Sequence, residues 1–247
     1  MDSIGRTFIE KTKHRHLSVS DQSRGAAPPS LEDEYDPSGK IIDLPSPREC
    51  TVSSEDVRTL IERRQSIREY AARPISRGEL SYLLWATQGV KEIYDAYITL
   101  RTVPSAGARH AFETYLLLNR VEGIAPGLYR YLAIEHKLIL VSARNTLQQE
   151  IMRSCFSQTM IRDAAAVFIW AANIYRMAWR YSERAYRYVF LDAGHVCQNL
   201  YLASESIGCG VCALAAYDDD GLNAILGLDG EEKFAIYLAT VGKKKEM

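Results

Sequence analysis

Long apolar runs, an excess of charge of one sign and a disulfide framework are all missing from this sequence of 247 residues. No apolar run approaches the roughly 18 residues that a membrane-spanning helix needs. The N-terminal stretch MDSIGRTFIEKTKHRH also lacks the apolar core of a secretory signal. These absences predict a cytoplasmic protein that makes no membrane contact.

The charges are balanced, with 30 Lys and Arg against 31 Asp and Glu and a formal net charge of -1. Nucleic-acid modules usually carry a basic surplus across the domain, so no nucleic-acid partner is expected. Five cysteines form an odd set without framework spacing, which favours reduced thiols. The C-x-x-C at Cys209 and Cys212 has no second ligand pair and falls where a strand begins, so we expect neither a metal nor a disulfide there.

The first 50 residues differ in composition from the rest of the chain. Residues 23–50 hold five of the eight prolines and show little helical periodicity. The sequence therefore predicts an extended arm over residues 1–50 and one folded domain over residues 51–247. Ile41, Ile42 and Leu44 are apolar enough to dock the arm on a folded surface.

Beyond residue 52 the pattern alternates between helical and strand periodicity. Ser53 or Ser54 is expected to cap a helix whose Val57, Leu60 and Ile61 form one buried face and which stops near residues 64–66. Ser76 and Glu79 form a capping box that opens a second helix, which Gly89 can close. Strands are expected at 112–121, 127–132, 136–141, 164–173, 211–217 and 232–242, and helices at 146–156, 183–208 and from 218. This order predicts an α+β fold in which helices flank a sheet.

Two stretches carry chemical signals. In ERRQSIREY, residues 62–70, Arg63, Arg64 and Arg68 cluster around Gln65 and Ser66 at a helix end. The cluster is either a solvated helix face or a pocket for one small anion. The small residues 104–107, Pro-Ser-Ala-Gly, directly precede a buried strand. They are either a simple turn or a place where backbone closely approaches a flat ligand.

Taken in order, RRQSIREY, PISRGELSYLLWATQGV, RTVPSAGA, GLYRY, AGHVCQNLYLASESIGCG and YLATVGKK resemble the nitroreductase-like FMN flavoproteins. The resemblance runs from about residue 52 to 244 and is closest to the SagB-type dehydrogenases, which oxidise azoline rings in peptides. It implies a central, mostly antiparallel sheet flanked by helices. It also implies a homodimer with FMN at the subunit interface, and we expect the arm to lie across the partner subunit.

The resemblance also assigns site residues. The family's Arg-x-Ser-x-Arg/Lys element holds FMN, and guanidinium groups suit a phosphate dianion. The Pro-Ser-Ala-Gly turn contacts the flavin of the partner subunit, and a late strand passes near flavin N5, where only a backbone N–H remains to polarise it. Lys243 either reaches the phosphate or belongs to a solvated tail. The cofactor-binding residues so implied are Arg64, Gln65, Ser66, Arg68, Pro104, Ser105, Ala106, Gly107, Leu214, Ala215, Ala216 and Lys243.

The implied activity is ping-pong hydride transfer, from NADH or NADPH to FMN and then to a small organic acceptor such as a nitroaromatic or a quinone. A stand-alone azoline dehydrogenase reoxidised by oxygen, and a flavin-binding module without turnover, remain as alternatives. The hydride step needs no dedicated acid or base, so no catalytic residue is named. The polar residues Asp192, His195, Gln198 and Asn199 follow one helix stripe and form either a structural network or a proton donor. The aromatics around residues 179–188 are expected to mix core packing and pocket wall.

Overall fold

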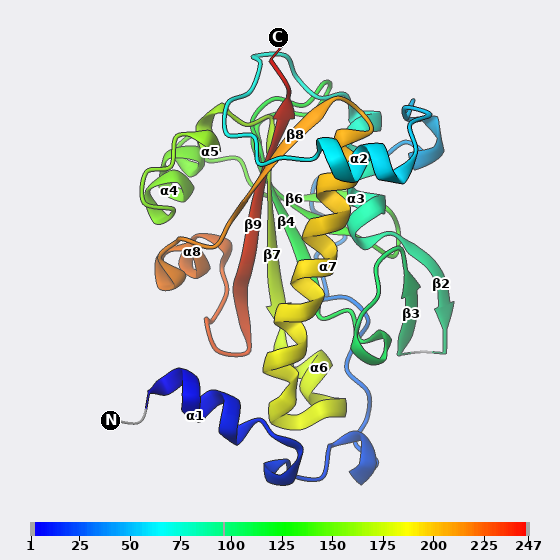
Figure 1. Ribbon diagram of the computed structural model, residues 1–247, viewed down its shortest axis with the longest axis vertical. Helices are drawn as coiled ribbons and strands as arrows, with labels where there is room; N and C mark the ends of the chain where they lie inside the picture. Colours follow the sequence, from blue (N-terminus) through cyan, green and yellow to red (C-terminus); the bar gives the residue numbers. More distant parts are fainter. Residues whose placement is uncertain (1–2, 96, 246–247) are drawn as a thin grey trace.

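A seven-stranded sheet forms the centre of the molecule (Figure 1). The computed structural model describes residues 3–95 and 97–245. All strand pairings in this sheet are antiparallel, in the order β1-β6-β5-β4-β7-β9-β8. The predicted fold class is therefore confirmed. The strands are β1 Ile41–Asp43, β4 Phe112–Leu118, β5 Gly127–Leu132, β6 Lys137–Ser142, β7 Ala166–Asn173, β8 Cys209–Leu214 and β9 Lys233–Lys243.

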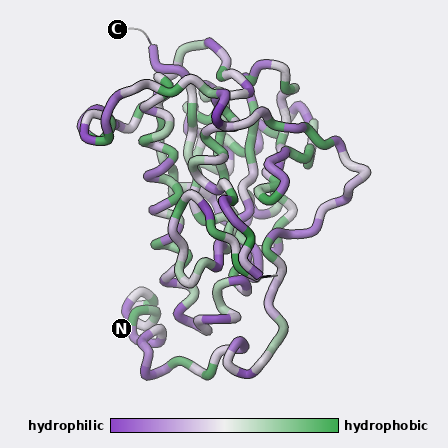
Figure 2. The backbone as a smooth tube through the Cα atoms, turned by 90° about the vertical axis from the view of Figure 1, so that its right-hand side faces the viewer, coloured by the Kyte–Doolittle hydropathy of each residue, from purple (hydrophilic) through white to green (hydrophobic). Residues whose placement is uncertain are grey.

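Helices cover both faces of the sheet. The long helix α7, Ala185–Glu205, and α3, Arg77–Gln88, lie over one face, and α4, Leu147–Ser154, and α8, Asp219–Leu226, pack on the other together with the short α5, Met160–Asp163. Strand β7 serves both cores, because Phe168 and Trp170 face one and Val167 and Ile169 face the other. Figure 2 shows the most hydrophobic segments gathered in these central elements.

The helix predictions hold in part. Helix α3 begins at the predicted capping box, in which Ser76 and Glu79 satisfy each other's backbone N–H groups. Helix α2, Val57–Arg63, ends where expected, but its cap is Asp56 rather than Ser53 or Ser54. The predicted buried face is wrong as well, because Val57 and Ile61 are exposed in the single chain.

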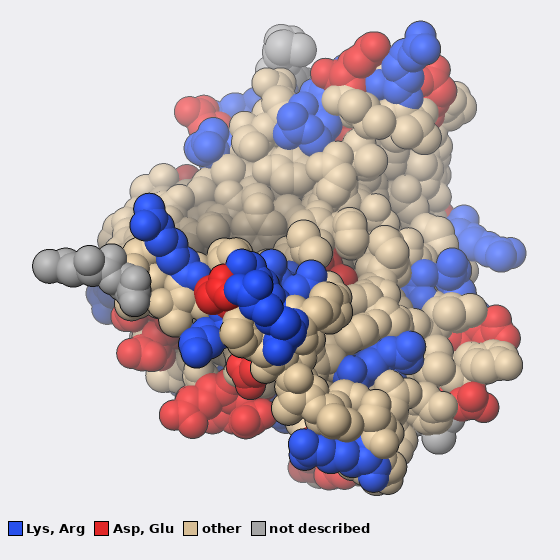
Figure 3. Space-filling view, turned by 60° about the horizontal axis from the view of Figure 1, so that its bottom comes forward, with Lys and Arg blue, Asp and Glu red and all other residues tan. Residues whose placement is uncertain are grey.

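Other elements were not predicted from the sequence. They are α1, Ile4–Lys11, the edge strand β1, the hairpin of β2, Val90–Tyr94, and β3, Ile98–Arg101, the short α5, and helix α6, Ile174–Tyr181. The hairpin leads within two residues into the Pro-Ser-Ala-Gly turn, and α6 leads into α7. No described helix is long and apolar enough to cross a bilayer. On the face drawn in Figure 3, Lys and Arg atoms are interspersed with Asp and Glu atoms.

The arm packs on its own chain. Ile41, Ile42 and Asp43 pair with β6 as an added edge strand, and the Ser81 hydroxyl donates to the carbonyl of Pro45 at 2.6 Å. The prediction that apolar residues of the arm would dock is confirmed. The prediction that they would dock on a partner subunit is wrong, because the free edge of β6 in the same chain offers unpaired backbone groups to the segment.

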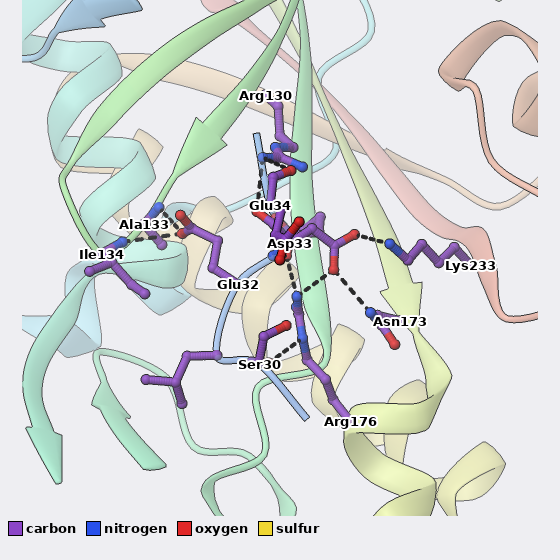
Figure 4. Close-up of polar contacts among 12 residues, drawn as sticks. Ser30, Glu32, Asp33, Glu34, Arg130, Ala133, Ile134, Asn173, Arg176 and Lys233 are labelled. Atoms are coloured by element: carbon purple, nitrogen blue, oxygen red, sulfur yellow. Dashed lines mark hydrogen bonds and ion pairs between the residues drawn. The ribbon is translucent and has the colours of Figure 1, made fainter. Parts of the chain in front are cut away.

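A buried ionic cluster fixes the arm further upstream (Figure 4). Asp33 accepts hydrogen bonds from Arg176 and from Lys233, each at 2.6 Å, and Arg176 also pairs with Glu113 at 2.7 Å. The Arg176 side chain is 1% exposed. A charge so deeply buried needs its partners, so residues 30–34 are an integral part of the fold.

A buried histidine close to the Pro-Ser-Ala-Gly turn makes stability depend on pH. Burial, and then the charge of Arg101, lower the pKa of His110 from 6.5 to about 3. Because the pKa is lower in the folded state, the unfolded state binds the proton more readily. The fold therefore keeps this part of its stability above pH 6.5 and loses it as the pH falls towards 3. Between pH 7.5 and pH 5 the loss should be about 2 kcal/mol.

Urea unfolding of wild type and His110→Gln at these two pH values measures this effect. The variant should lose the histidine's part of the pH dependence. His195→Gln, at an exposed position on α7, serves as the matched control and should keep it. Equal pH dependence in wild type and His110→Gln would contradict the assignment.

Candidate functional site

The arginine stretch lies along the edge of the sheet. Ser66 bridges to Val211 of β8, the backbone N–H of Ile67 donates to the carbonyl of Val211 at 2.8 Å, and that of Ala71 donates to the carbonyl of Lys243 at 2.9 Å. Strand β8 is the last strand of the sheet, so its outer backbone groups are free to hold this segment. The edge thereby fixes the backbone from which Arg64 and Arg68 project.

Two glycines allow this close approach. Gly210 and Gly242 are register partners on β8 and β9. A Cβ on Gly210 would lie 2.7 Å from Ile67, and one on Gly242 would lie 2.7 Å from the Tyr70 ring. The Tyr70 hydroxyl is held by Thr240 at 2.7 Å, so the ring cannot easily withdraw.

Gly242→Ala is therefore expected to destabilise the fold by about 1–3 kcal/mol, the cost of overpacking a tight site. It should also shift the arginine segment and weaken anion binding there. Urea unfolding and anion titration measure the two effects. Gly194→Ala is the matched control, because a Cβ at this exposed helical glycine meets nothing within 4 Å. Unchanged stability of Gly242→Ala would show that the segment is not held by this contact.

Tyr201 of α7 joins two of the predicted site elements. Its hydroxyl lies 3.0 Å from the Ser66 hydroxyl and accepts a hydrogen bond from the backbone N–H of Ala213 at 2.9 Å. The Arg64 guanidinium sits over its ring, 5.2 Å from the centroid. The structure thus brings the arginine stretch to the end of β8, immediately before Leu214. Sequence reasoning missed Tyr201, although it lies three residues beyond Gln198 on the polar stripe of its helix.

The cations near this edge differ in how they are neutralised. Arg63 pairs with Glu55 and lies 3.7 Å from Glu205, and Lys243 pairs with Glu79 on α3. Arg64 and Arg68 have no ion-pair partner among the described residues. These two guanidinium groups are therefore the ones left to meet an anion, whereas Lys243 is not brought into the cluster.

A groove of about 470 Å³ runs beside the arginine segment. Gln65, Ser66 and Arg68 are exposed, so their side chains can be reached from solvent. The groove is lined by Arg63, Gln65, Ser66, Ile67, Arg68, Glu69, Glu205, Lys244 and Lys245.

The Pro-Ser-Ala-Gly turn is held from beneath by Asp192 of α7. The Asp192 carboxylate accepts from the Ser105 hydroxyl at 2.6 Å and from the backbone N–H of Ala106 at 3.3 Å, and burial raises the pKa of Asp192. Gly107 has φ +58 and packs against the Tyr181 hydroxyl and the Arg180 side chain. Pro104 is exposed, so the turn presents its outer side to solvent.

Within one chain the turn and the arginine stretch stay apart. Asp192 contacts the turn and Tyr201 contacts the arginine stretch. They are nine positions apart on one helix, which corresponds to about 14 Å. The single chain therefore brings together the arginine stretch and the end of β8, but not the turn.

The polar stripe of α7 divides into two pairs. Asp192 holds the turn, and Asn199 donates to the carbonyl of Ala86 at 2.9 Å, so both are structural. His195 and Gln198 are exposed.

Ala215 and Ala216 are exposed just beyond β8, and Gln158 donates to the carbonyl of Ala216. Cys209 and Cys212 belong to the two different cores, so their side chains leave β8 on opposite faces.

Known proteins share this arrangement. Residues 61–243 match the model of the Nitroreductase family. The chain belongs to the nitroreductase family. A protein of Methanocaldococcus jannaschii, named as a nitroreductase, is 35% identical over 208 residues, which are 84% of this chain and 100% of that protein. Membership makes the chain an oxidoreductase by family and confirms the resemblance seen in the sequence.

Two further likenesses bear on the type of nitroreductase. The trifolitoxin-processing protein TfxB of Rhizobium leguminosarum bv. trifolii is 28% identical over 133 residues, covering 52% of this chain and 36% of that protein. The E. coli microcin synthetase McbBCD complex shares the fold, with a TM-score of 0.65, 18% identity, and coverage of 97% of this chain and 93% of that chain.

Among solved nitroreductase structures, one from Anabaena variabilis has a TM-score of 0.73 at 27% identity. It covers 97% of this chain, and this chain spans 47% of the Anabaena chain.

Proposed function

We propose that this nitroreductase-family chain is an FMN-dependent oxidoreductase that passes hydride from NADH or NADPH to a small organic acceptor. The observation that carries the proposal is the placement of Arg64, Ser66 and Arg68 on the edge of β8, with both guanidinium groups free of carboxylate partners among the described residues. Guanidinium groups bind phosphate oxygens with forked, charge-assisted hydrogen bonds. The donor set therefore fits the phosphate of FMN.

Each group of residues has a definite task in this proposal. Arg64, Ser66 and Arg68 hold the phosphate, and Tyr201 orients Ser66 and Arg64. Backbone at Leu214, Ala215 and Ala216 borders the flavin ring. Bound FMN supplies the redox chemistry, since it can accept hydride from a nicotinamide and give it to an acceptor.

A second copy of the chain completes the site. The turn at Ser105–Gly107 lies about 14 Å along α7 from the arginine stretch of its own chain. A homodimer would allow the turn of one chain to reach the flavin held by the other. Arg180 and Tyr181, which pack against Gly107, would then line the pocket on the substrate side.

The visible spectrum and the FMN content of the purified protein test this function first. We expect a yellow protein with one FMN per chain, a dimeric mass in light scattering, and steady oxidation of NADH or NADPH when an acceptor is added. A colourless protein that does not take up FMN would refute the proposal. Bound FMN without turnover would instead favour a flavin-binding module.

A second candidate is an azoline dehydrogenase of SagB type. It is favoured by the likeness to a trifolitoxin-processing protein and by the fold shared with a microcin synthetase complex. In that case the protein would oxidise azoline rings in a peptide, and oxygen would take the electrons. Oxygen consumption with an azoline-containing peptide, in the absence of any nicotinamide, separates this function from the first.

A further inference from the structure

A polar pocket lies on the sheet face opposite α7, next to the arm. Its volume is about 410 Å³. Tyr115 and Arg130, register partners on β4 and β5, form its floor, and Tyr115 belongs to the core beneath α4 and α8. The pocket shares no lining residue with the groove beside Arg68. It is lined by Ser30, Asp33, Glu34, Tyr115, Arg130, Asn173, Gly227, Leu228 and Lys233.

Arg130 is the unusual member of this pocket. It is only 8% exposed, and its Nη2 donates to the carbonyls of Asp33 at 3.0 Å and of Glu34 at 3.1 Å. Its Nε is buried without any hydrogen-bond partner. No described carboxylate forms an ion pair with the guanidinium. A buried charge left in this state is costly unless a counter-ion reaches it.

The buried carboxylates nearby are already engaged, whereas Glu34, which also lines the pocket, is exposed to solvent. Asp33 is shared by Arg176 and Lys233, and Glu113 pairs with Arg176. The Glu32 carboxylate accepts hydrogen bonds from the backbone N–H groups of Ala133 and Ile134, at 2.6 and 3.2 Å, and burial raises its pKa. The cluster thus combines the buried cations Arg101, Arg130 and Arg176 and the partly exposed Lys233 with the carboxylates Glu32, Asp33 and Glu113.

We propose that this pocket binds a small oxyanion, a carboxylate or phosphate group, through Arg130, with the Tyr115 hydroxyl and Lys233 as further donors. Charge-assisted hydrogen bonds to a planar guanidinium suit both groups. Because Arg130 also holds the carbonyls of Asp33 and Glu34, the bound anion fastens residues 30–34 to the sheet. Anion concentration thereby sets how firmly the arm is held.

Thermal unfolding with inorganic phosphate or acetate, against chloride at constant ionic strength, tests the proposal. We expect at least one oxyanion to raise Tm by roughly 3–6 °C at ten times its Kd. The titration uses the Arg68→Ala background, so that the groove at the edge of β8 contributes little. Response to phosphate alone, to acetate alone or to both identifies the group bound, and each supports the site.

Variants locate the effect. Arg130→Gln should weaken anion binding at least about tenfold in a calorimetric titration, because the variant removes a charged donor. Tyr115→Phe and Lys233→Met keep the guanidinium, and at least one of them should also weaken binding if Arg130→Gln does not fold. Arg162→Gln, at an exposed ion pair, is the control and should change nothing. No stabilisation beyond chloride, or an undiminished response in all three pocket variants, would overturn the proposal.

Discussion

Asp33→Ala is expected to lower the free energy of unfolding by about 3–5 kcal/mol, because it removes one of the two carboxylates that neutralise a buried guanidinium. Arg176 is 1% exposed, and Asp33 is shared between it and Lys233. Loss of the carboxylate also frees the amide of Asn173, which donates to Asp33 at 3.0 Å. Urea unfolding at neutral pH measures the change.

The matched control is Asp163→Ala. Asp163 also pairs with an arginine, Arg162, but both side chains are about half exposed. An exposed pair contributes only about 0–1 kcal/mol. If Asp33→Ala costs no more than Asp163→Ala, the arm is not anchored by the buried cluster.

Arg68→Ala is expected to weaken FMN binding roughly 10- to 150-fold, which corresponds to about 1.5–3 kcal/mol for a hydrogen bond to a charged group. Arg68 is exposed at the groove and has no ion-pair partner among the described residues. Its full charge is therefore available to the phosphate. Fluorescence titration of the apoprotein with FMN measures the affinity.

Arg63→Ala provides the control from the same stretch. Arg63 is already neutralised by Glu55 and Glu205, so its removal should change FMN affinity several times less. Equal losses from the two variants would contradict the assignment, because the phosphate would then depend on Arg63 as much as on Arg68.

The sequence predicted those helices and strands that depend on residues close together in the chain. The capping box of Ser76 and Glu79 lies within four residues. The continuous apolar run at 164–173 indicates a strand buried on both faces, whichever elements cover it. The order of motifs then identified the family. By contrast, the exposed Val57 and Ile61 mimic a buried helix face, since periodicity alone does not say what covers it.

The parts that escaped prediction depend on contacts distant in sequence. Tyr201 meets Ser66 across 135 positions, and nothing in either segment announces the other. Nothing in the local sequence distinguishes the glycines at 210 and 242 from other strand residues, because their role depends on the distant Ile67 and Tyr70. The prolines of the arm predicted its extended conformation, whereas its attachment depends on Asp33 and on the free edge of β6.

The attachment of the arm also bears on how the chain folds as it is synthesised. Asp33 leaves the ribosome early, yet its partners follow 143 positions later, at Arg176, and 200 positions later, at Lys233. Contacts between such distant residues slow folding, because a long loop must close before they form. The Asp33 carboxylate therefore waits without its cationic partners until Arg176 and Lys233 have been synthesised, so this anchor of the arm forms late in folding.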